Sequence, residues 1–241
     1  MAEGMVRERL NIYYLLDTSG SMSGPRIQQL NTCMQELKPA LEEAGIENNV
    51  EIVVRAIEFG NGETARWHTG DKANGVPIEN FTWVNLQANG GCTPTSIALE
   101  MVADALQAEY LGSRTLRPVI ILVTDGGCTD GEVRYRSACG AVKSKINGNA
   151  TRIAVGVENA QKSELEEFAT CGRIGEDENK PFVFETSNAE TMTEIIRWAS
   201  VVSIKNSVKT GVGIGAGSVG GGGSGSSGNG GGIELSEPTW I

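Results

Sequence analysis

The chain lacks the long apolar segments that mark several classes of protein. None of its apolar runs reaches the roughly eighteen residues that a membrane-spanning helix needs. Residues 1–10 contain charges and no uninterrupted apolar stretch, so they do not have the form of a secretory signal peptide. These two absences predict a cytoplasmic protein without a membrane partner.

Positive charge is also scarce. The chain has 241 residues, with 20 Lys and Arg against 30 Asp and Glu, and its net charge is −10. Such a protein repels a phosphate backbone unless a local basic patch intervenes. The nearest candidates for a patch are interpreted as ordinary solvated charges; they are Arg114 with Arg117 and Arg134 with Arg136. We therefore expect no nucleic-acid partner.

Few residues suit soft metals or acid–base catalysis. The single histidine, His68, lies in a short polar stretch and is expected at the surface. The five cysteines are odd in number and form no Cys-x-x-Cys pair, which favours reduced thiols over a disulfide framework or a zinc site. Cys92 and Cys128 lie in two of the loops considered next, so they are the pair to watch under oxidation.

Oxygen-bearing side chains follow the first apolar segment. Residues 10–16 are mostly apolar, and Asp17, Ser19 and Ser21 come directly behind them at alternate positions. Alternate residues of an extended segment point in roughly the same direction. A carboxylate and two hydroxyls gathered in this way are hard oxygen donors, which suit Mg²⁺, with Mn²⁺ and Ca²⁺ as alternatives.

Two later segments carry matching donors. Thr93 precedes a predicted helix, and the apolar strand at residues 119–124 ends in Asp125. Thr95 competes with Thr93 as a metal ligand, although a threonine there would also suit a helix cap. Thr93 is favoured because it follows a glycine pair and precedes a proline that suits the first helical turn.

The pattern Asp-x-Ser-x-Ser, followed by a Thr and then an Asp, resembles the metal-ion-dependent adhesion site (MIDAS) of the von Willebrand factor A (vWA) domain family. The first part alone is weak, because Asp, Ser and Gly crowd ordinary turns, but the three parts occur in the right order at the ends of predicted elements. The resemblance covers about residues 10–203. It implies one divalent ion held directly or through water by three hydroxyls and two carboxylates, those of Ser19, Ser21, Thr93, Asp17 and Asp125.

The same resemblance implies a partner. In that family an Asp or Glu of a bound protein completes the coordination shell of the ion. Within the family, the chain is most similar to bacterial stand-alone domains of the tellurite-resistance (TerY) type. This likeness implies a kinase or a phosphatase as partner and a role in stress signalling.

Apolar segments alternate with segments of helical periodicity. Strands are expected at residues 10–16, 50–59, 65–69, 119–124, 152–157 and 182–185. Helices are expected at about 25–45, 95–111, 132–146, from 163, and 187–203, the last two opening on capping boxes, Ser163 with Glu166 and Ser187 with Glu190. Continuous apolar strands joined through helices predict an α/β fold, a Rossmann-like doubly wound, mostly parallel six-stranded sheet with helices on both faces and one short antiparallel edge strand.

The composition changes near the C-terminal end. Residues 211–232 are almost entirely Gly, Ser and Ala and are expected to form a flexible tether. The chain is accordingly divided into an N-terminal lead, a vWA domain, a linker and a C-terminal peptide, at residues 1–9, 10–207, 208–232 and 233–241. Glu234 or Glu237 of that peptide would reach the metal as a self-ligand; the alternatives are a peptide that docks on another protein or an inert end.

A binding module fits the predicted site better than an enzyme. The loops that carry the site contain no histidine or lysine, and the chain has no Gly-x-Ser-x-Gly elbow. An ion held mainly by neutral hydroxyls stays electrophilic, which favours capture of a carboxylate over activation of water. We therefore expect an intracellular scaffold that binds an acidic residue of a protein partner. A structural subunit with a loop-stabilising metal, and less so a metal-dependent hydrolase, are the alternatives.

Overall fold

The protein is built around one mixed β-sheet, described here from a computed structural model. The structure describes residues 7–62, 64–174, 177–210, 214–215 and 234–235. The strands lie in the order β10-β7-β6-β1-β2-β3. Their bounds are Val183–Thr186, Thr151–Val157, Val119–Thr124, Glu8–Thr18, Val50–Gly60 and Thr64–Thr69. All neighbouring pairs are parallel except β2 with β3, which is antiparallel. The predicted mostly parallel sheet with an antiparallel edge strand is thus confirmed, and the six expected strands form its main path.

Short strands extend this arrangement. β4 (Val76–Pro77), β5 (Arg114–Thr115) and β11 (Ile214–Gly215) join the main sheet. β8 (Cys171–Ile174), β9 (Asp177–Pro181) and β12 (Glu234–Leu235) form a second, small sheet. The pairing of β11 with β5 means that two residues of the predicted tether are strand.

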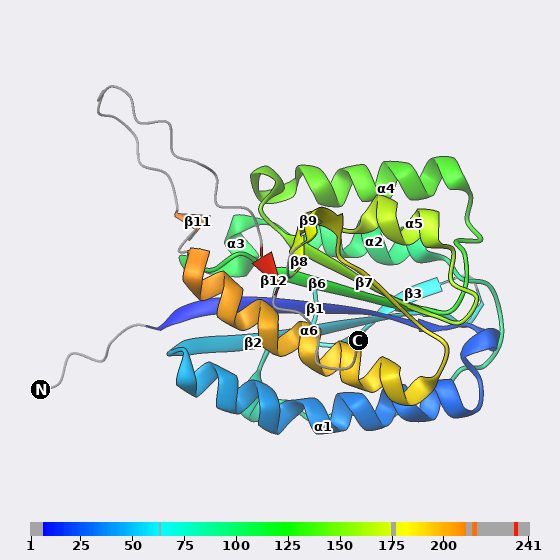
Figure 1. The fold of residues 1–241 in the computed structure, drawn as a ribbon, viewed down its shortest axis with the longest axis horizontal. Coiled ribbons are helices and arrows are strands. Elements are labelled where there is room, and N and C mark those ends of the chain that lie inside the picture. The colour runs from blue at the N-terminus through cyan, green and yellow to red at the C-terminus, as the bar shows by residue number, and fades with distance from the viewer. Residues whose placement is uncertain (1–6, 63, 175–176, 211–213, 216–233, 236–241) are drawn as a thin grey trace, which may run out of the picture.

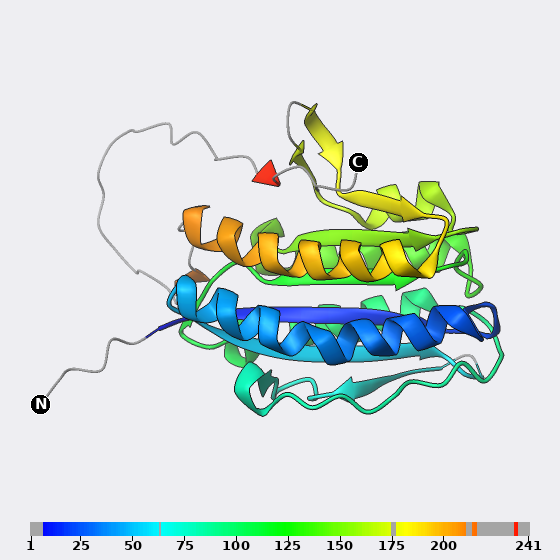
Figure 2. The same ribbon diagram turned by 60° about the horizontal axis from the view of Figure 1, so that its bottom comes forward.

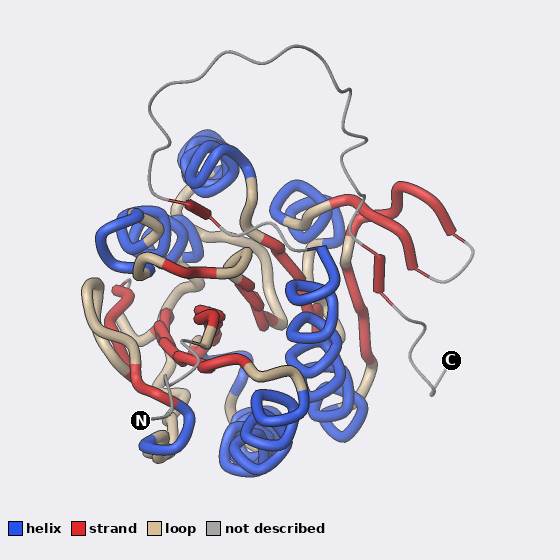
Figure 3. Tube along the Cα trace, turned by 90° about the vertical axis from the view of Figure 1, so that its left-hand side faces the viewer, coloured by secondary structure: helices blue, strands red, loops and turns tan. Residues whose placement is uncertain are grey.

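Helices cover both faces of the main sheet, which Figure 3 shows nearly end-on. One face carries α1 (Pro25–Glu47) and α6 (Ala189–Thr210), which lie side by side (Figures 1 and 2). The other carries α2 (Thr95–Ala105), α4 (Glu132–Ser144) and α5 (Lys162–Phe168). Shorter helical turns are α3 (Ala108–Leu111), η1 (Gly20–Met22), η2 (Ile78–Asn80) and η3 (Lys145–Gly148). Within the described ranges, none of the helices combines the length and the apolar composition that crossing a membrane requires.

The core consists of two apolar layers that share the strands of the sheet. In β1, Tyr14 and Leu16 pack in the layer under α1 and α6, while Tyr13 and Leu15 pack in the layer under α2 and α4. All four side chains are fully buried. Alternate residues of a strand point to opposite faces, so a strand covered on both sides needs the continuous apolar run seen in the sequence.

One predicted helix is broken in two. The segment expected as a single helix at 95–111 leaves helical geometry at Leu106 and Gln107, between α2 and α3. Leu106 is buried against the core, and the turn that follows presents backbone carbonyls to buried polar groups. The Tyr110 carbonyl accepts a hydrogen bond from Arg55 (3.2 Å), and the Leu111 carbonyl accepts one from Asn11 (3.2 Å). The break therefore satisfies donors that a straight helix would not reach.

Both predicted capping boxes are wrong. α5 begins at Lys162 with Gln161 before it, so Ser163 lies inside the helix. Asn188, not Ser187, precedes α6, and its Oδ1 accepts the backbone N–H of Thr191 at 2.8 Å. The residue that precedes α5 thus lies two positions before the predicted cap, and the residue that precedes α6 lies one position after it.

The last helix is longer than expected. α6 continues to Thr210 instead of ending near Ser203, so it includes the first residues assigned to the linker. Its final turns are held by packing, because Ile204 and Ser207 are buried against the sheet. The hydroxyl of Ser207 also donates to the Arg117 carbonyl (3.4 Å).

Candidate metal centre

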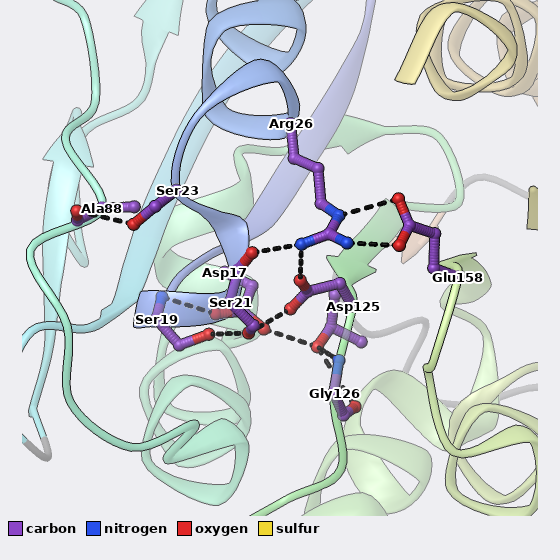
Figure 4. Close-up of polar contacts among 10 residues, drawn as sticks. Asp17, Ser19, Ser21, Ser23, Arg26, Ala88, Asp125, Gly126 and Glu158 are labelled. Atoms are coloured by element: carbon purple, nitrogen blue, oxygen red, sulfur yellow. Dashed lines mark hydrogen bonds and ion pairs between the residues drawn. The ribbon is translucent and has the colours of Figure 1, made fainter. Parts of the chain in front are cut away.

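The candidate site lies at the carboxyl ends of β1 and β6. These strands are parallel neighbours, and their register pairs Leu16 with Val123. The loops that begin with Asp17 and Asp125 therefore leave the sheet at the same edge, which is the edge where open α/β sheets bind ligands. Figure 4 shows the side chains that meet there.

Asp17 lies at the buried bottom of the site. Its Oδ1 accepts the backbone N–H of Ser19 (2.8 Å), and its Oδ2 accepts the hydroxyl of Thr124 (2.6 Å). Burial raises the pKa of Asp17 to about 6, and the hydrogen bonds from Thr124 and Ser19 oppose this rise. The carboxylate is thus fixed in position and strongly desolvated.

Hydroxyl groups connect the two loops. Ser19 Oγ lies 3.0 Å from Ser21 Oγ, and Ser21 Oγ donates to Asp125 Oδ1 (2.6 Å). The turn η1 causes this arrangement, since Met22 N bonds the Ser19 carbonyl (3.1 Å) and brings Ser21 back over Ser19. Ser19 is buried whereas Ser21 is exposed, so the site opens to solvent at Ser21.

Thr93 comes to the same place from a third loop. A Cβ on Gly126, the residue after Asp125, would lie 3.6 Å from Thr93 Oγ1. The backbones are tied as well, because Thr93 N donates to Thr129 Oγ1 (2.8 Å) and Thr129 N donates to the Thr93 carbonyl (3.0 Å). The Thr93 hydroxyl therefore lies beside the Asp125 loop.

Thr95 has a local role. It is the first residue of α2, preceded by Pro94, and its hydroxyl lies 3.5 Å from the Thr93 carbonyl. The amino end of α2 is instead held by Asp130, whose Oδ1 accepts the hydroxyl (2.9 Å) and the backbone N–H (3.4 Å) of Ser96. Thr95 does not cap the helix with its side chain.

Asp125 forms an ion pair with the Arg26 side chain. The Arg26 Nη1 lies 3.3 Å from Asp125 Oδ2 and also donates to the Ser21 carbonyl. The same guanidinium forms a two-pronged contact with Glu158, from Nε to Oε1 (3.0 Å) and from Nη2 to Oε2. Asp125 is buried, and burial raises its pKa against the lowering effects of Ser21 and Arg26.

Sequence reasoning missed Arg26, Thr124 and Glu158. Glu158 had a usable signal, because it directly follows β7 and so occupies the same kind of strand-end position as Asp17 and Asp125. Arg26 and Thr124 flank the recognised motifs, but no feature of the sequence distinguishes them from ordinary helix and strand residues.

Among the described residues no cysteine forms a disulfide, Cys92 and Cys128 included. The Cys128 thiol contacts Asp130 and lies 3.4 Å from Ser96 Oγ. Burial raises the pKa of Cys128, which disfavours the reactive thiolate.

The expectation for His68 was wrong in one respect. Its side chain is only 11% exposed and its ring lies 4.5 Å from that of Trp83. The Nε2 atom lies 2.8 Å from the Val84 carbonyl oxygen. His68 therefore fastens the loop after β3 instead of lying free at the surface.

Glu234 does not lie at the candidate site, which corrects the self-ligand prediction for this residue. Its strand β12 pairs with β8, with Glu234 opposite Arg173. The segment leading into β8 runs beside the amino end of β7, because Thr170 N bonds the Arg152 carbonyl (2.9 Å). The candidate site is at the opposite, carboxyl end of the sheet. Glu237 lies outside the described residues.

The donors that meet at this edge suit a hard divalent cation. They are two carboxylates and three hydroxyls, with no thiolate or imidazole among them. The described part of the chain holds no group of three or more His, Cys, Asp or Glu side chains arranged to bind a metal. A metal site here would therefore have to rely on neutral hydroxyl oxygens in addition to carboxylates.

Comparison with known proteins agrees with this architecture. The family model of the von Willebrand factor type A domain matches residues 11–198. The mouse inter-alpha-trypsin inhibitor heavy chain 4 is 29% identical over 153 residues, covering 61% of this chain and 15% of that protein. The pig inter-alpha-trypsin inhibitor heavy chain H4 is 26% identical over 208 residues, covering 83% of this chain and 22% of that protein. The chain thus spans less than a quarter of the length of these relatives.

Solved structures have the same fold. Proximal thread matrix protein 1 from the mussel byssus, solved with a zinc-occupied MIDAS motif, has a TM-score of 0.59 at 19% identity and covers 81% of this chain and 48% of that one. A von Willebrand factor type A protein from Catenulispora acidiphila has a TM-score of 0.58 at 19% identity, covering 83% and 43%. The match over most of its length means that the chain belongs to the von Willebrand factor type A domain family.

Proposed function

We propose that this chain is a binding module that captures an acidic residue of a partner protein through one divalent ion. The observation that carries the proposal is the hydrogen-bonded series from Ser19 through Ser21 to Asp125, which joins the ends of two adjacent strands. The side chains that would hold the ion are the five oxygen donors of the candidate site, Asp17, Ser19, Ser21, Thr93 and Asp125.

The donors divide into two kinds. Both oxygens of Asp17 already accept hydrogen bonds within the protein, so this carboxylate suits contact through water. The hydroxyls of Ser19, Ser21 and Thr93 retain oxygen lone pairs and suit direct contact. When bound, the ion would supply positive charge at the exposed mouth of the site.

Mg²⁺ is the ion that we propose, with Mn²⁺ and Ca²⁺ as alternatives. Oxygen-only donors favour these hard cations over zinc, which is most often held by thiolates and imidazoles. The zinc in the structure of the mussel protein supports a divalent ion at this motif in that protein. It does not select the metal that this chain uses.

A carboxylate ligand fits the site better than a hydrolytic reaction. The described residues around the proposed ion position provide carboxylates, hydroxyls and one guanidinium, with no imidazole or amine to act as a general base. Burial raises the pKa of both Asp17 and Asp125, that of Asp17 to about 6. Asp17 is buried and doubly hydrogen-bonded, so it does not reach a substrate. We therefore propose a module without enzymatic activity.

The cellular setting stays a prediction. A stress or tellurite-resistance pathway and a kinase or phosphatase as the partner both rest on the sequence resemblance. A pull-down from native lysate with and without EDTA would identify partners that depend on the ion.

Calorimetric titration with Mg²⁺ and Mn²⁺ tests the site. Binding should be lost in Asp17→Ala and Ser19→Ala, and retained in Ser23→Ala, which removes a hydroxyl of the same loop. Ser23 is a matched control because its hydroxyl donates to the Ala88 carbonyl (3.2 Å), away from the proposed ion (Figure 4). Unchanged ion affinity in both Asp17→Ala and Ser19→Ala would reject the site assignment.

A further inference from the structure

The guanidinium of Arg26 lies between two carboxylates at the edge of the candidate site. One carboxylate belongs to Asp125, a proposed ion donor, and the other to Glu158, which extends from the loop after β7 (Figure 4). The Arg26 side chain is 24% exposed and that of Glu158 is 35% exposed, whereas the Asp125 side chain is only 2% exposed. Arg26 and Glu158 therefore lie on the solvent side of Asp125.

The contact between Arg26 and Glu158 has a well-defined geometry. The guanidinium meets the carboxylate with two parallel contacts, the geometry in which Arg pairs most strongly with a carboxylate. Glu158 has a φ of 50°, which is uncommon for a residue other than glycine. Its backbone is held there by a hydrogen bond from Glu158 N to the Thr186 carbonyl (2.7 Å). Backbone strain of this kind persists where the surroundings enforce it, often at functional sites.

We infer that Arg26 and Glu158 set the charge of the candidate site and so decide the balance between ion affinity and capture of an acidic ligand. This inference rests on the proposed function. In ionised form, three carboxylates (Asp17, Asp125 and Glu158) and one guanidinium (Arg26) leave a net charge of −2. A divalent ion brings the cluster to zero. An incoming carboxylate then meets a neutral cluster instead of a negative one.

Removal of the Arg26 charge and removal of the Glu158 charge would shift this balance in opposite directions. Loss of the Arg26 charge would leave the ion in a more negative surrounding, so the ion would bind more tightly and an anionic ligand more weakly. Loss of the Glu158 charge would leave Arg26 uncompensated, so the ion would bind more weakly and the anion more tightly. Arg26 and Glu158 thereby act as specificity residues for an acidic ligand without themselves holding the ion.

The inference is tested by two measurements on matched variants of the full chain. Calorimetry gives the Mn²⁺ affinity, and water-proton relaxation at saturating Mn²⁺ follows the displacement of bound water by acetate. Arg26→Gln should bind Mn²⁺ roughly tenfold more tightly and acetate severalfold more weakly, the scale expected for one nearby charge partly screened by water. Glu158→Gln should show the reverse for both ligands.

Controls separate position from net charge. Arg136→Gln and Glu132→Gln make the same changes in net charge on α4, where these exposed residues pair with each other. Arg26→Lys keeps the positive charge but loses the two parallel contacts with Glu158. Because the charge is kept, its Mn²⁺ affinity should stay near that of the unaltered protein. Thermal unfolding confirms that each variant is folded.

The outcomes are distinct. Opposite shifts in Arg26→Gln and Glu158→Gln, beyond those of the α4 controls, support the inference. Shifts in the same direction, or shifts equal to the controls, overturn it while leaving the ion site intact. If the unaltered chain binds no divalent ion, the proposed function fails and the inference fails with it.

Discussion

Asp17 combines complete burial with a pKa raised to about 6, against an ordinary value of 3.8. In the unfolded chain this carboxyl titrates near its ordinary value, so between about pH 4 and pH 6 the folded protein binds the extra proton. The stabilising effect of that proton is complete below about pH 4 and is lost as the pH rises through 6. In the metal-free protein, Asp17 therefore opposes folding at neutral pH.

This behaviour gives a pH prediction. In EDTA, the free energy of unfolding of the unaltered protein relative to Asp17→Asn should fall by about 2–3 kcal/mol between pH 4 and pH 7, since two units of pKa correspond to about that energy. Urea denaturation at a series of pH values measures the difference. A difference that stays constant or rises with pH would contradict the described environment of Asp17.

Thr93 tests a single hydroxyl. Thr93→Ala should weaken Mg²⁺ binding at least tenfold and lower the free energy of unfolding by only about 1 kcal/mol, because it removes one oxygen donor and a small side-chain volume. Thr93→Ser keeps the hydroxyl and should retain most of the affinity. Calorimetry and thermal unfolding give the two quantities. A large loss of stability with intact ion binding would favour a structural role for this residue.

At the scale of elements, the end of β2 must come very close to the loop that carries Ser19. Gly60 has a φ of 143°, and a Cβ there would lie 2.6 Å from the backbone nitrogen of Ser19. Gly60→Ala should therefore displace the loop, cost more than about 2 kcal/mol and abolish ion binding. Gly62→Ala is the control, because that glycine has a φ of 79° with nothing within 4 Å of the added Cβ. Equal effects of the two substitutions would contradict the close approach.

Arg55 is the buried charge that joins several elements. The side chain lies under the ring of Tyr13 and donates to Asn11 Oδ1 (2.8 Å), while other donors reach the carbonyls of Asp71, Ala73 and Tyr110. Burial lowers its pKa. Charged residues are rarely buried to this degree unless they are paired, and here backbone carbonyls replace an opposite charge.

Arg55→Ala should lower the free energy of unfolding by about 3–5 kcal/mol, because it empties a filled space and leaves polar groups without partners. Arg55→Lys should recover only part of this loss, since lysine cannot reproduce the planar set of donors. Urea denaturation provides the measurement. A cost below about 1 kcal/mol for Arg55→Ala would mean that the described contacts contribute little.

At the scale of the whole molecule, the positions of the central strands β7, β6, β1 and β2 could be predicted because these strands are buried on both faces and read as apolar runs. The order of elements then implies that the loops after β1 and β6 meet. Helix ends were less predictable, since tertiary contacts decide them. After the break that follows α2, the Tyr110 and Leu111 carbonyls of α3 accept hydrogen bonds from Arg55 and Asn11, and α6 continues because Ile204 packs in the core.

The candidate site was predictable to a similar extent. Its oxygen donors come from three short motifs whose side chains have recognisable chemistry. The pairing of Arg26 with Asp125 and Glu158 was not predictable, because it joins residues far apart in the chain, 132 positions for Arg26 and Glu158, and depends on the backbone conformation of Glu158. Surface ion pairs leave no periodic pattern in a sequence.

The central claim is that three loops hold one divalent ion at the edge formed by β1 and β6. Anomalous diffraction from crystals soaked in Mn²⁺ tests it most directly. The account predicts a single strong peak within about 2.1–2.3 Å of Ser19 Oγ, Ser21 Oγ and Thr93 Oγ1, with Asp17 and Asp125 in direct or water-mediated contact. A peak elsewhere in the molecule, or no peak at a concentration that saturates binding in solution, would contradict it.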